Sequence, residues 1–386
     1  MRELAILIYL LGFKGLFTLF KRLPLKNKVT FLVSFPDNTL YIYEELQKQK
    51  VDIEVVFLCH HRCFNTFKEI NELTYLVESR HLLHTIVGIY HLATSKQIVV
   101  DNYYGFLAAT TFKKGVNCTQ IWHAAGAIKQ FGAKDPANVN RSLAAQKRFK
   151  KVYHQFDQIV IGSDQMASIF KKAFLANETS FLKVGIPRTD FFFDEKKLQQ
   201  VTAAFYENNP LLKEKKVILY APTFRKGEEA VNHLKLDIQK MATELSSDYV
   251  LLIKFHPAVC LTLDVFYDDS NFAFDYSHYP NVNELLIITD ILITDYSSIP
   301  MEFSLLKRKM IFFAYDLADY KQENGLWEDF EASVPGPVAT HTNEVIEAIL
   351  NEEINLLQLD AYAKKWLQYC DGAASERLVK VLFQTK

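Results

Sequence analysis

The stretch ILITDYSS, residues 291–298, indicates the fold class of the chain. It starts with isoleucine and leucine without a polar interruption, as in a strand that is buried on both faces of a parallel sheet. The sequence becomes polar at Asp295, and residues 299–308 have helical character, with Pro300 in the first turn, where proline is tolerated. The stretch therefore predicts a buried strand, a polar turn and a helix in succession.

The same pattern recurs on both sides of this stretch. Apolar runs bounded by turns occupy residues 29–35, 52–58, 97–102, 119–124 and 158–163 in the first half, and 216–222 and 249–257 in the second. Helical stretches separate these runs. The pattern predicts an α/β fold with two units of parallel sheet, joined near residues 190–212.

This interpretation divides the chain into four parts. We expect an amino-terminal segment at 1–28, a first domain at 29–195, a second domain at 196–345 and carboxyl-terminal helices at 346–386. The length of 386 residues fits two domains of ordinary size. No internal repeat or low-complexity segment stands out.

The composition excludes several classes of protein. Hydrophobic residues make up 49% of the chain and charged residues 23%, which excludes a disordered or fibrous protein. The 44 basic and 45 acidic residues give a net charge of −1, which argues against nucleic acid as a partner. An anionic partner must therefore meet local basic patches.

The cysteines predict neither disulfides nor a metal site. They are five in number and scattered, as expected for reduced thiols in a cytosolic protein. Residues 59–63 (CHHRC) lack the spacing of structural zinc sites, and no second ligand pair follows, so we interpret them as a strand end that runs into a polar turn. No Asp-x-Asp motif stands at a strand end.

The amino terminus leaves three interpretations open. Residues 4–13 are apolar, but Lys14 ends the run, and ten residues are too few to span a bilayer. The segment is an amphipathic helix in the membrane interface, a helix packed on the protein, or a poor signal peptide. A basic stretch at 141–151, with Lys171 and Lys172 beyond it, is either a solvated helix face or a second contact with anionic lipid. Together the segments favour peripheral membrane attachment.

Polar side chains gather where the predicted strands end. Ligands of open parallel sheets bind beyond the carboxyl ends of the strands. In the second domain these positions hold Thr223, Arg225, Lys254, His256, Asp295, Tyr296, Ser297 and Ser298. The first domain contributes His123 and Gly126, and Arg188 follows near the junction. The sequence therefore predicts a ligand site where cations, hydroxyls and imidazoles converge.

Two features of this site remain ambiguous in isolation. Ser297 and Ser298 are either ordinary helix caps or phosphate ligands, and the second interpretation gains from Arg225 and Lys254 at neighbouring strand ends. A single histidine at a strand end carries little information. His123 and His256, facing one cleft, make a suitable pair for proton transfer because imidazole titrates near neutral pH.

Five motifs in fixed order resemble one known family. They are residues 122–126 (WHAAG), 185–190 (GIPRTD), 220–225 (YAPTFR), 254–257 (KFHP) and 293–298 (ITDYSS). In this order they resemble the CDP-glycerol glycerophosphotransferases of wall teichoic acid synthesis, roughly from residue 30 to the end of the chain. The resemblance implies a GT-B fold, with two Rossmann-like domains that face each other across a cleft.

The resemblance also implies an activity and its partners. Glycerol phosphate passes from CDP-glycerol to a hydroxyl of a polyprenyl-diphosphate-linked ManNAc-GlcNAc disaccharide, and CMP is released. The enzyme attaches peripherally to the cytoplasmic face of the cell membrane, beside other teichoic acid enzymes, and no cofactor or metal is implied. Residues 124–126 replace the Gly-Thr-Pro of the polymerases, and the chain is short, so it resembles the primase branch.

The resemblance assigns roles to individual residues. His123 is implied as the general base, and His256 as the group that binds the diphosphate and stabilises the leaving CMP. Arg188, Arg225 and Lys254 offset negative charge on the donor, and Glu302 accepts hydroxyls where the family has an acidic residue. The other expected substrate-binding residues are Trp122, Ala124, Ala125, Gly126, Pro222, Thr223, Asp295, Ser297 and Ser298.

Three alternatives stay open. The chain could add later glycerol- or ribitol-phosphate units, as a transferase or polymerase of the same pathway. It could be a GT-B glycosyltransferase that uses a nucleotide sugar, since fold does not fix function. A membrane scaffold without activity is disfavoured, because an inert cleft has no need of so many polar residues at strand ends.

Overall fold

The computed structural model describes residues 2–223, 225, 230–231, 234–255, 260–261, 272–351 and 353–384. The chain forms two compact units. The first comprises Met1–Ala124, Phe131–Asp190 and Gln368–Lys386, and the second comprises Ala125–Gln130 and Phe191–Leu367. Each unit is built around its own parallel sheet.

The described residues of the first unit form a seven-stranded parallel sheet in the order β3-β2-β1-β4-β5-β6-β7. The strands are β1 (Lys26–Val33), β2 (Glu54–Cys59), β3 (Thr74–Leu76), β4 (Ser95–Val100), β5 (Asn117–Gln120), β6 (Gln158–Val160) and β7 (Phe181–Leu182). In the centre, Phe31 of β1 lies between Phe57 of β2 and Val99 of β4. These three side chains are buried, as expected for strands covered on both faces.

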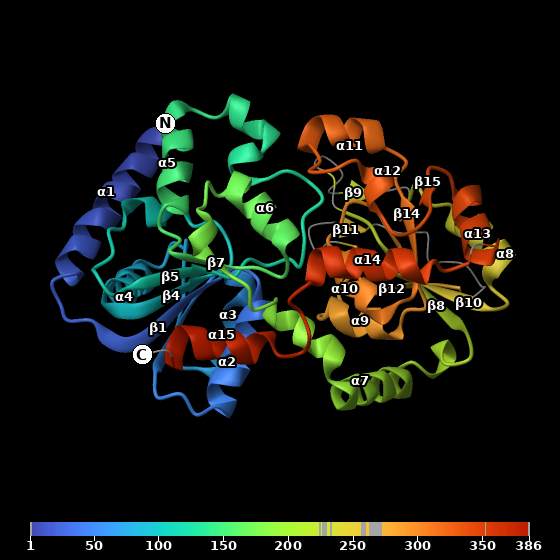
Figure 1. Ribbon diagram of the computed structural model, residues 1–386, viewed down its shortest axis with the longest axis horizontal. Coiled ribbons are helices and arrows are strands. Elements are labelled where there is room, and N and C mark those ends of the chain that lie inside the picture. The colour runs from blue at the N-terminus through green and yellow to red at the C-terminus, as the bar shows by residue number, and fades with distance from the viewer. Residues whose placement is uncertain are drawn as a thin grey trace. The chain divides into compact units, whose positions relative to one another are not determined.

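Helices surround the sheet of the first unit (Figure 1). They are α1 (Arg2–Phe20), α2 (Pro36–Lys48), α3 (Phe64–Ile70), α4 (Leu82–Thr94), α5 (Leu143–Tyr153), α6 (Asp164–Ala173) and α15 (Ala374–Val379). Helix α1 packs on α4, and α15 packs on α2. The backbone amides of Ala374 and Ser375, at the start of α15, donate to the carboxylate of Asp190 at 2.9 and 2.8 Å. A segment from late in the chain thus completes the first unit.

The sheet of the second unit has six parallel strands among the residues described, in the order β12-β10-β8-β13-β14-β15. They are β8 (Lys216–Ala221), β10 (Tyr249–Ile253), β12 (Ala273–Asp275), β13 (Ile291–Thr294), β14 (Lys309–Phe313) and β15 (Val338–Ala339). A separate pair joins β9 (Ala230–Val231) and β11 (Cys260–Leu261).

The second unit has its own helices. They are α7 (Glu195–Asn208), α8 (Ile238–Leu245), α9 (Val282–Ile288), α10 (Ile299–Phe303), α11 (Leu317–Asn324), α12 (Phe330–Ser333), α13 (Thr342–Asn351) and α14 (Leu356–Leu367). Side chains of β8, β10 and β13 pack with those of α8 and α13 in one hydrophobic core. Helix α10 follows β13 directly, as ILITDYSS predicts.

The predicted α/β class with two parallel sheets is confirmed. Each predicted apolar run contains a strand, although several strands end earlier than the run does. The predicted domain boundaries stay predictions. The carboxyl-terminal helices do not form a separate part, because α14 belongs to the second unit and α15 to the first.

Helix α1 is longer than the apolar run 4–13 indicates. It continues through Gly12 and Lys14 to Phe20, and its segment Glu3–Phe20 is long and apolar enough to cross a membrane by length and composition. The expectation that it is too short is therefore wrong on length. Phe13 and Phe17 are buried against the first unit, while much of the remaining helix is exposed. Its exposed side carries leucines, not the charged face of a typical interfacial helix.

Candidate active site

His123 lies just beyond β5, at the carboxyl end of the sheet of the first unit. Its Nδ1 is 2.9 Å from the backbone oxygen of Asp101, which follows β4. A carbonyl oxygen only accepts hydrogen bonds, so Nδ1 carries the proton and, in the neutral ring, the lone pair is on Nε2. This tautomer can take a proton at Nε2, which is the property that a general base requires.

Aromatic side chains fix the plane of the His123 ring. The ring centroid lies 4.2 Å from that of Phe35, with the planes stacked at 20°, and 4.2 Å from that of Trp122. Trp122, which has a left-handed backbone conformation (φ 55°), also stacks on Phe131. The imidazole is therefore oriented by its neighbours as well as by its hydrogen bond.

The buried carboxyl of Asp101 organises the segment that carries Phe35. It accepts hydrogen bonds from the backbone amides of Ser34 and Phe35, both at 2.7 Å, and from the Tyr104 hydroxyl at 2.9 Å. Burial raises the pKa of Asp101 to about 7, although these hydrogen bonds oppose the shift. The predictions missed this residue, whose only signal in the sequence is its position as the polar end of the run 97–102.

Arg188 contacts the same segment as His123. Its guanidinium donates to the backbone oxygen of His123 at 2.9 Å and lies 3.6 Å from the carboxylate of Asp37. Its backbone amide donates to Asn38, whose side chain in turn donates to the oxygen of Trp122. The structure thus brings together three predicted residues, Trp122, His123 and Arg188.

The chain passes from the first unit to the second after Ala124. The predicted residues Ala125 and Gly126 therefore belong to the second unit. Ala125 is fully buried. A Cβ atom at Gly126 would lie 2.9 Å from side-chain atoms of Met301 in α10 and Trp366 in α14. Close packing therefore explains the glycine, independently of any ligand.

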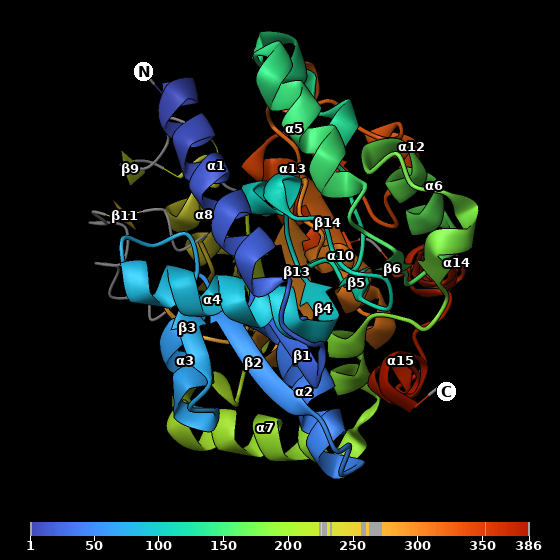
Figure 2. The same ribbon diagram turned by 90° about the vertical axis from the view of Figure 1, so that its left-hand side faces the viewer.

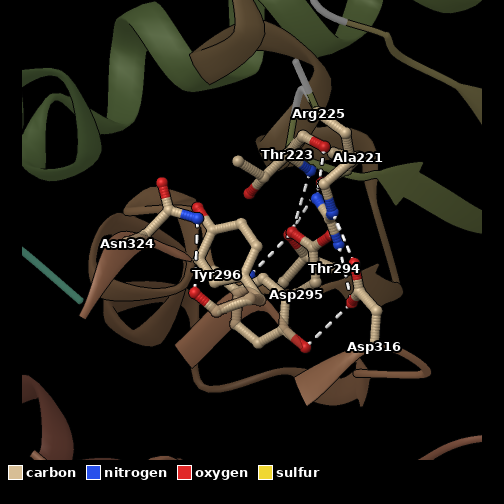
Figure 3. A network of polar contacts seen from close by, with 9 residues as sticks. Ala221, Thr223, Arg225, Thr294, Asp295, Tyr296, Asp316 and Asn324 are labelled. Atoms are coloured by element: carbon tan, nitrogen blue, oxygen red, sulfur yellow. Dashed lines mark hydrogen bonds and ion pairs between the residues drawn. The ribbon is translucent and has the colours of Figure 1, made fainter. Parts of the chain in front are cut away.

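In the second unit, Arg225 is the centre of a polar network at the ends of β8 and β13 (Figure 3). Its Nη2 donates to Asp295 at 2.9 Å, and its Nε donates to Asp316 at 2.7 Å. The guanidinium also lies 4.9 and 5.1 Å from the ring centroids of Tyr320 and Tyr296. Two carboxylates thus offset the charge of Arg225 within the protein, so contact with a donor phosphate stays a prediction.

Asp295 connects the ends of two neighbouring strands. Its Oδ1 accepts from the backbone amides of Thr223, after β8, and Tyr296, after β13, at 2.8 and 2.7 Å. Thr223 and Pro222 are both half-buried beside it. Asp295 is itself buried, so its visible role is to hold the two loops together.

The serines and Glu302 lie where the strand-turn-helix prediction places them. The Ser297 hydroxyl accepts from the amide of Ile299 at 3.2 Å, and Ser298 precedes the first turn of α10 without a side-chain capping bond. Helix α10 has five residues, with Pro300 at its start, and is shorter than the predicted segment 299–308. Glu302 is almost fully buried within it.

Lys254 lies at the end of β10, beside β8. Its ammonium group donates to the backbone oxygens of Ser277 and Tyr279 at 2.6 and 2.8 Å. Burial lowers its pKa, and the carboxylate of Asp275 opposes this shift. Lys254 thus holds the segment after β12.

His256 lies outside the described residues. Its pairing with His123 across a cleft therefore stays a prediction, as do the ligand contacts of all the residues above. Among the residues that the structure describes, no group of three or more histidine, cysteine, aspartate or glutamate side chains forms a metal site.

Comparison with known proteins points to one family. The profile of the CDP-Glycerol:Poly(glycerophosphate) glycerophosphotransferase family matches residues 16–384. The teichoic acid glycerol-phosphate primase of Bacillus subtilis (strain 168) is 34% identical over 92% of this chain and 92% of its own length. The teichoic acid poly(ribitol-phosphate) polymerase of Bacillus spizizenii is 33% identical over 94% of this chain, which spans 57% of that protein.

Solved structures support the fold. The wall teichoic acid polymerase TagF has a TM-score of 0.79 and 24% identity, covering 98% of this chain and 94% of that chain. The UDP-GlcNAc 2-epimerase of Neisseria meningitidis follows with a TM-score of 0.57 and 13% identity, covering 93% of this chain and all of that chain. At these identities the likeness concerns the two-unit α/β architecture alone.

Proposed function

Since the chain belongs to the CDP-glycerol glycerophosphotransferase family, we propose that it transfers glycerol phosphate from CDP-glycerol to a lipid-linked acceptor and releases CMP. The coarser assignment, a glycerophosphotransferase of teichoic acid synthesis, follows from the family and from the relatives. The choice of donor and acceptor is our proposal. The family match carries this choice. The hydrogen bond from His123 to the Asp101 oxygen supports the assignment of the general base, because in the neutral ring it leaves the lone pair on Nε2.

In the proposed reaction, Nε2 of His123 takes the proton from a hydroxyl of the acceptor sugar. The hydroxyl oxygen forms a bond to the phosphorus that bears glycerol, and the bond from this phosphorus to the bridging oxygen breaks. CMP leaves with the bonding electrons. His256 would bind the diphosphate and stabilise CMP, and Lys254, Arg188, Ser297 and Ser298 would offset or bind the phosphate charge.

We further propose that the chain performs the priming step, on a polyprenyl-diphosphate-linked ManNAc-GlcNAc disaccharide. Two glycerol-phosphate primases are 34% identical to the chain, whereas four teichoic acid polymerases are 27–33% identical. This difference in identity is small, since one poly(ribitol-phosphate) polymerase reaches 33%. A later-acting glycerol- or ribitol-phosphate transferase is therefore the second candidate.

The proposed location is the cytoplasmic face of the cell membrane, with peripheral attachment. The exposed Ile8 and Leu19 of α1 and the exposed Lys171 and Lys172 of α6 support it, because apolar and basic groups together favour an anionic lipid surface. Other teichoic acid enzymes are proposed partners at this surface. Sedimentation with anionic vesicles, compared with neutral ones, tests the location.

Mass spectrometry of the product tests the reaction. The purified protein is incubated with CDP-glycerol and a disaccharide-diphosphate lipid analogue. We expect CMP and a product that carries one glycerol phosphate, whereas a ladder of longer products supports the later-acting candidate. Parallel reactions contain CDP-ribitol or a UDP-sugar. Release of UDP from the UDP-sugar, without turnover of CDP-glycerol, would contradict the proposal.

A further inference from the structure

A groove separates α1 from α5 on the first unit. It has a volume of about 1080 Å³, at the upper end of the range of ligand pockets. At one end the two helices are connected, because Glu3 of α1 accepts a hydrogen bond from Ser142, which caps α5, and lies 3.5 Å from Arg148 of α5. Both helices are visible in Figure 2.

The α1 wall of the groove is apolar from Leu4 to Leu11, and the charged residues Glu3 and Lys14 line it on either side of this stretch. Leu4, Leu7 and Leu11 line it and are 62%, 52% and 59% exposed. Their spacing of three and four residues places them on one face of the helix. Phe13 and Phe17, by contrast, are buried against the unit, where Phe13 stacks on Phe106. The helix is thus anchored by its phenylalanines and presents its leucines to the groove.

The α5 wall is positively charged. Lys147, Lys150 and Lys151 line the groove, and in the described part of the chain no acid pairs with them. The acidic residue among those that line the groove is Glu3, which forms an ion pair with Arg148. Small residues leave the groove open: Ala108 and Ala109 line it between the two helices, and Ala144 lines it on α5.

The groove is connected to the segment that holds His123. Ala108 and Ala109 belong to the 3-10 turn Gly105–Ala109, which follows Asp101 after β4. In the same segment, Tyr103 stacks on Phe149 of α5 with centroids 4.5 Å apart. Segment 101–109 therefore includes both the oxygen that binds His123 and two residues that line the groove.

We propose that this groove holds the lipid part of the acceptor, with the isoprenoid chain along the leucines of α1 and the diphosphate against the lysines of α5. The proposal rests on the proposed function, in which the acceptor is a lipid diphosphate. Charge complementarity supports it, because one wall matches an apolar chain and the other a multiply charged anion. A concave space lined by alanines favours a single chain over the flat surface of a bilayer.

The binding of farnesyl diphosphate, measured by titration calorimetry without detergent or vesicles, tests the groove directly. We expect the wild-type protein to bind it, and inorganic diphosphate to bind much more weakly. Ala144→Trp places a large side chain in the groove and should weaken the binding of farnesyl diphosphate about tenfold or more. This loss corresponds to about two CH₂ groups of the ligand that are no longer buried. Leu143→Trp, which puts the same side chain at an exposed neighbour outside the groove, should leave binding unchanged.

A second pair of variants tests the charged wall. Lys147→Glu should weaken the binding of farnesyl diphosphate and reduce its dependence on salt, because one cation no longer meets the diphosphate. Lys96→Glu makes the same charge change at an exposed position of β4, outside the groove, and should have no effect. Equal binding of inorganic and farnesyl diphosphate would overturn the proposal, as would unchanged binding in Ala144→Trp.

Two further measurements separate the groove from its alternatives. If Ala144→Trp no longer sediments with vesicles but binds farnesyl diphosphate as tightly as the wild type, the surface faces a bilayer and the proposal is wrong. CMP release from CDP-glycerol, with lipid-linked acceptor, tests the proposed function separately. A protein that binds farnesyl diphosphate in the groove but releases no CMP would contradict that function and still support the site.

Discussion

At the scale of single residues, the backbone oxygen of Asp101 decides which nitrogen of His123 can accept a proton. The same residue uses its carboxyl to hold the amides of Ser34 and Phe35, and Phe35 stacks on the imidazole. One buried residue thus orients the ring through its main chain and through its side chain. This dual role explains why a costly buried carboxyl stands next to the candidate base.

Replacing His123 by alanine tests the assignment of the base. We expect the rate of CMP release to fall by roughly 10²–10⁴-fold, the usual contribution of an acid–base group. The affinity for CDP-glycerol should change little, because the imidazole is assigned to the acceptor side. Calorimetry with CDP-glycerol and a CMP-release assay measure the two quantities.

The control for this variant is His278→Ala, which removes an exposed histidine of the second unit. It should keep wild-type turnover. If His123→Ala also keeps wild-type turnover on a lipid acceptor, His123 is not the base.

Asp101→Asn should change how stability depends on pH. Burial raises the pKa of Asp101 to about 7 in the folded protein, against about 3.9 in an unfolded chain. Between these values the folded protein keeps a proton that the unfolded chain has released, so the free energy of unfolding falls as the pH rises from about 4 to about 7. Asp101→Asn should lack this contribution to the decrease in the free energy of unfolding between about pH 4 and about pH 7.

Urea unfolding at several pH values between about 4 and about 7.5 measures this difference. Asp52→Asn, at an exposed position, serves as the control and should retain the wild-type profile. Parallel profiles for the wild type and Asp101→Asn would show that the Asp101 carboxyl is ionised normally in the folded protein.

At the scale of elements, the turn that contains Gly126 is fixed by packing. Residues 128–130 pair with 325–327, as Gln130 donates to the oxygen of Gly325 and Trp327 donates to that of Ile128. Gly126 itself lies against Met301 of α10 and Trp366 of α14. Gly126 is therefore fixed by packing within the second unit.

Gly126→Ala should destabilise the protein by about 1–3 kcal/mol, because its Cβ atom would lie 2.9 Å from Met301 and Trp366. The matched control is Gly12→Ala in α1, where no atom lies within 4 Å of the new Cβ. That change should stabilise the helix by roughly 0.5–1 kcal/mol. Urea midpoints compare the two variants, and equal stability of Gly126→Ala and wild type would refute the packing argument.

The elements differ in how well the sequence predicts them. Strands β8, β10 and β13 are signalled by uninterrupted apolar runs, whereas β7 and β15 have two residues each, too few for any periodicity. Position at a strand end was enough to select His123 and Arg225. It could not reveal their partners, because Asp316 is 91 residues from Arg225, and the Asp101 carboxyl binds amides 66 and 67 residues away.

At the scale of the whole molecule, the proposed transfer relies on the protein's own cations and needs no divalent ion. We therefore expect the rate of CMP release to persist in excess chelator. The assay compares the protein before and after dialysis against EDTA, with added magnesium as the control. Loss of activity that one metal ion restores would contradict this expectation.

The return of residues 368–384 to the first unit has a consequence for synthesis in the cell. Asp190 leaves the ribosome long before the amides of Ala374 and Ser375 exist to bind it. At about 5–20 residues per second, the delay is about 10–40 s. During that interval the nascent amino-terminal half has an incomplete surface over α2, where a chaperone could bind until translation supplies α15.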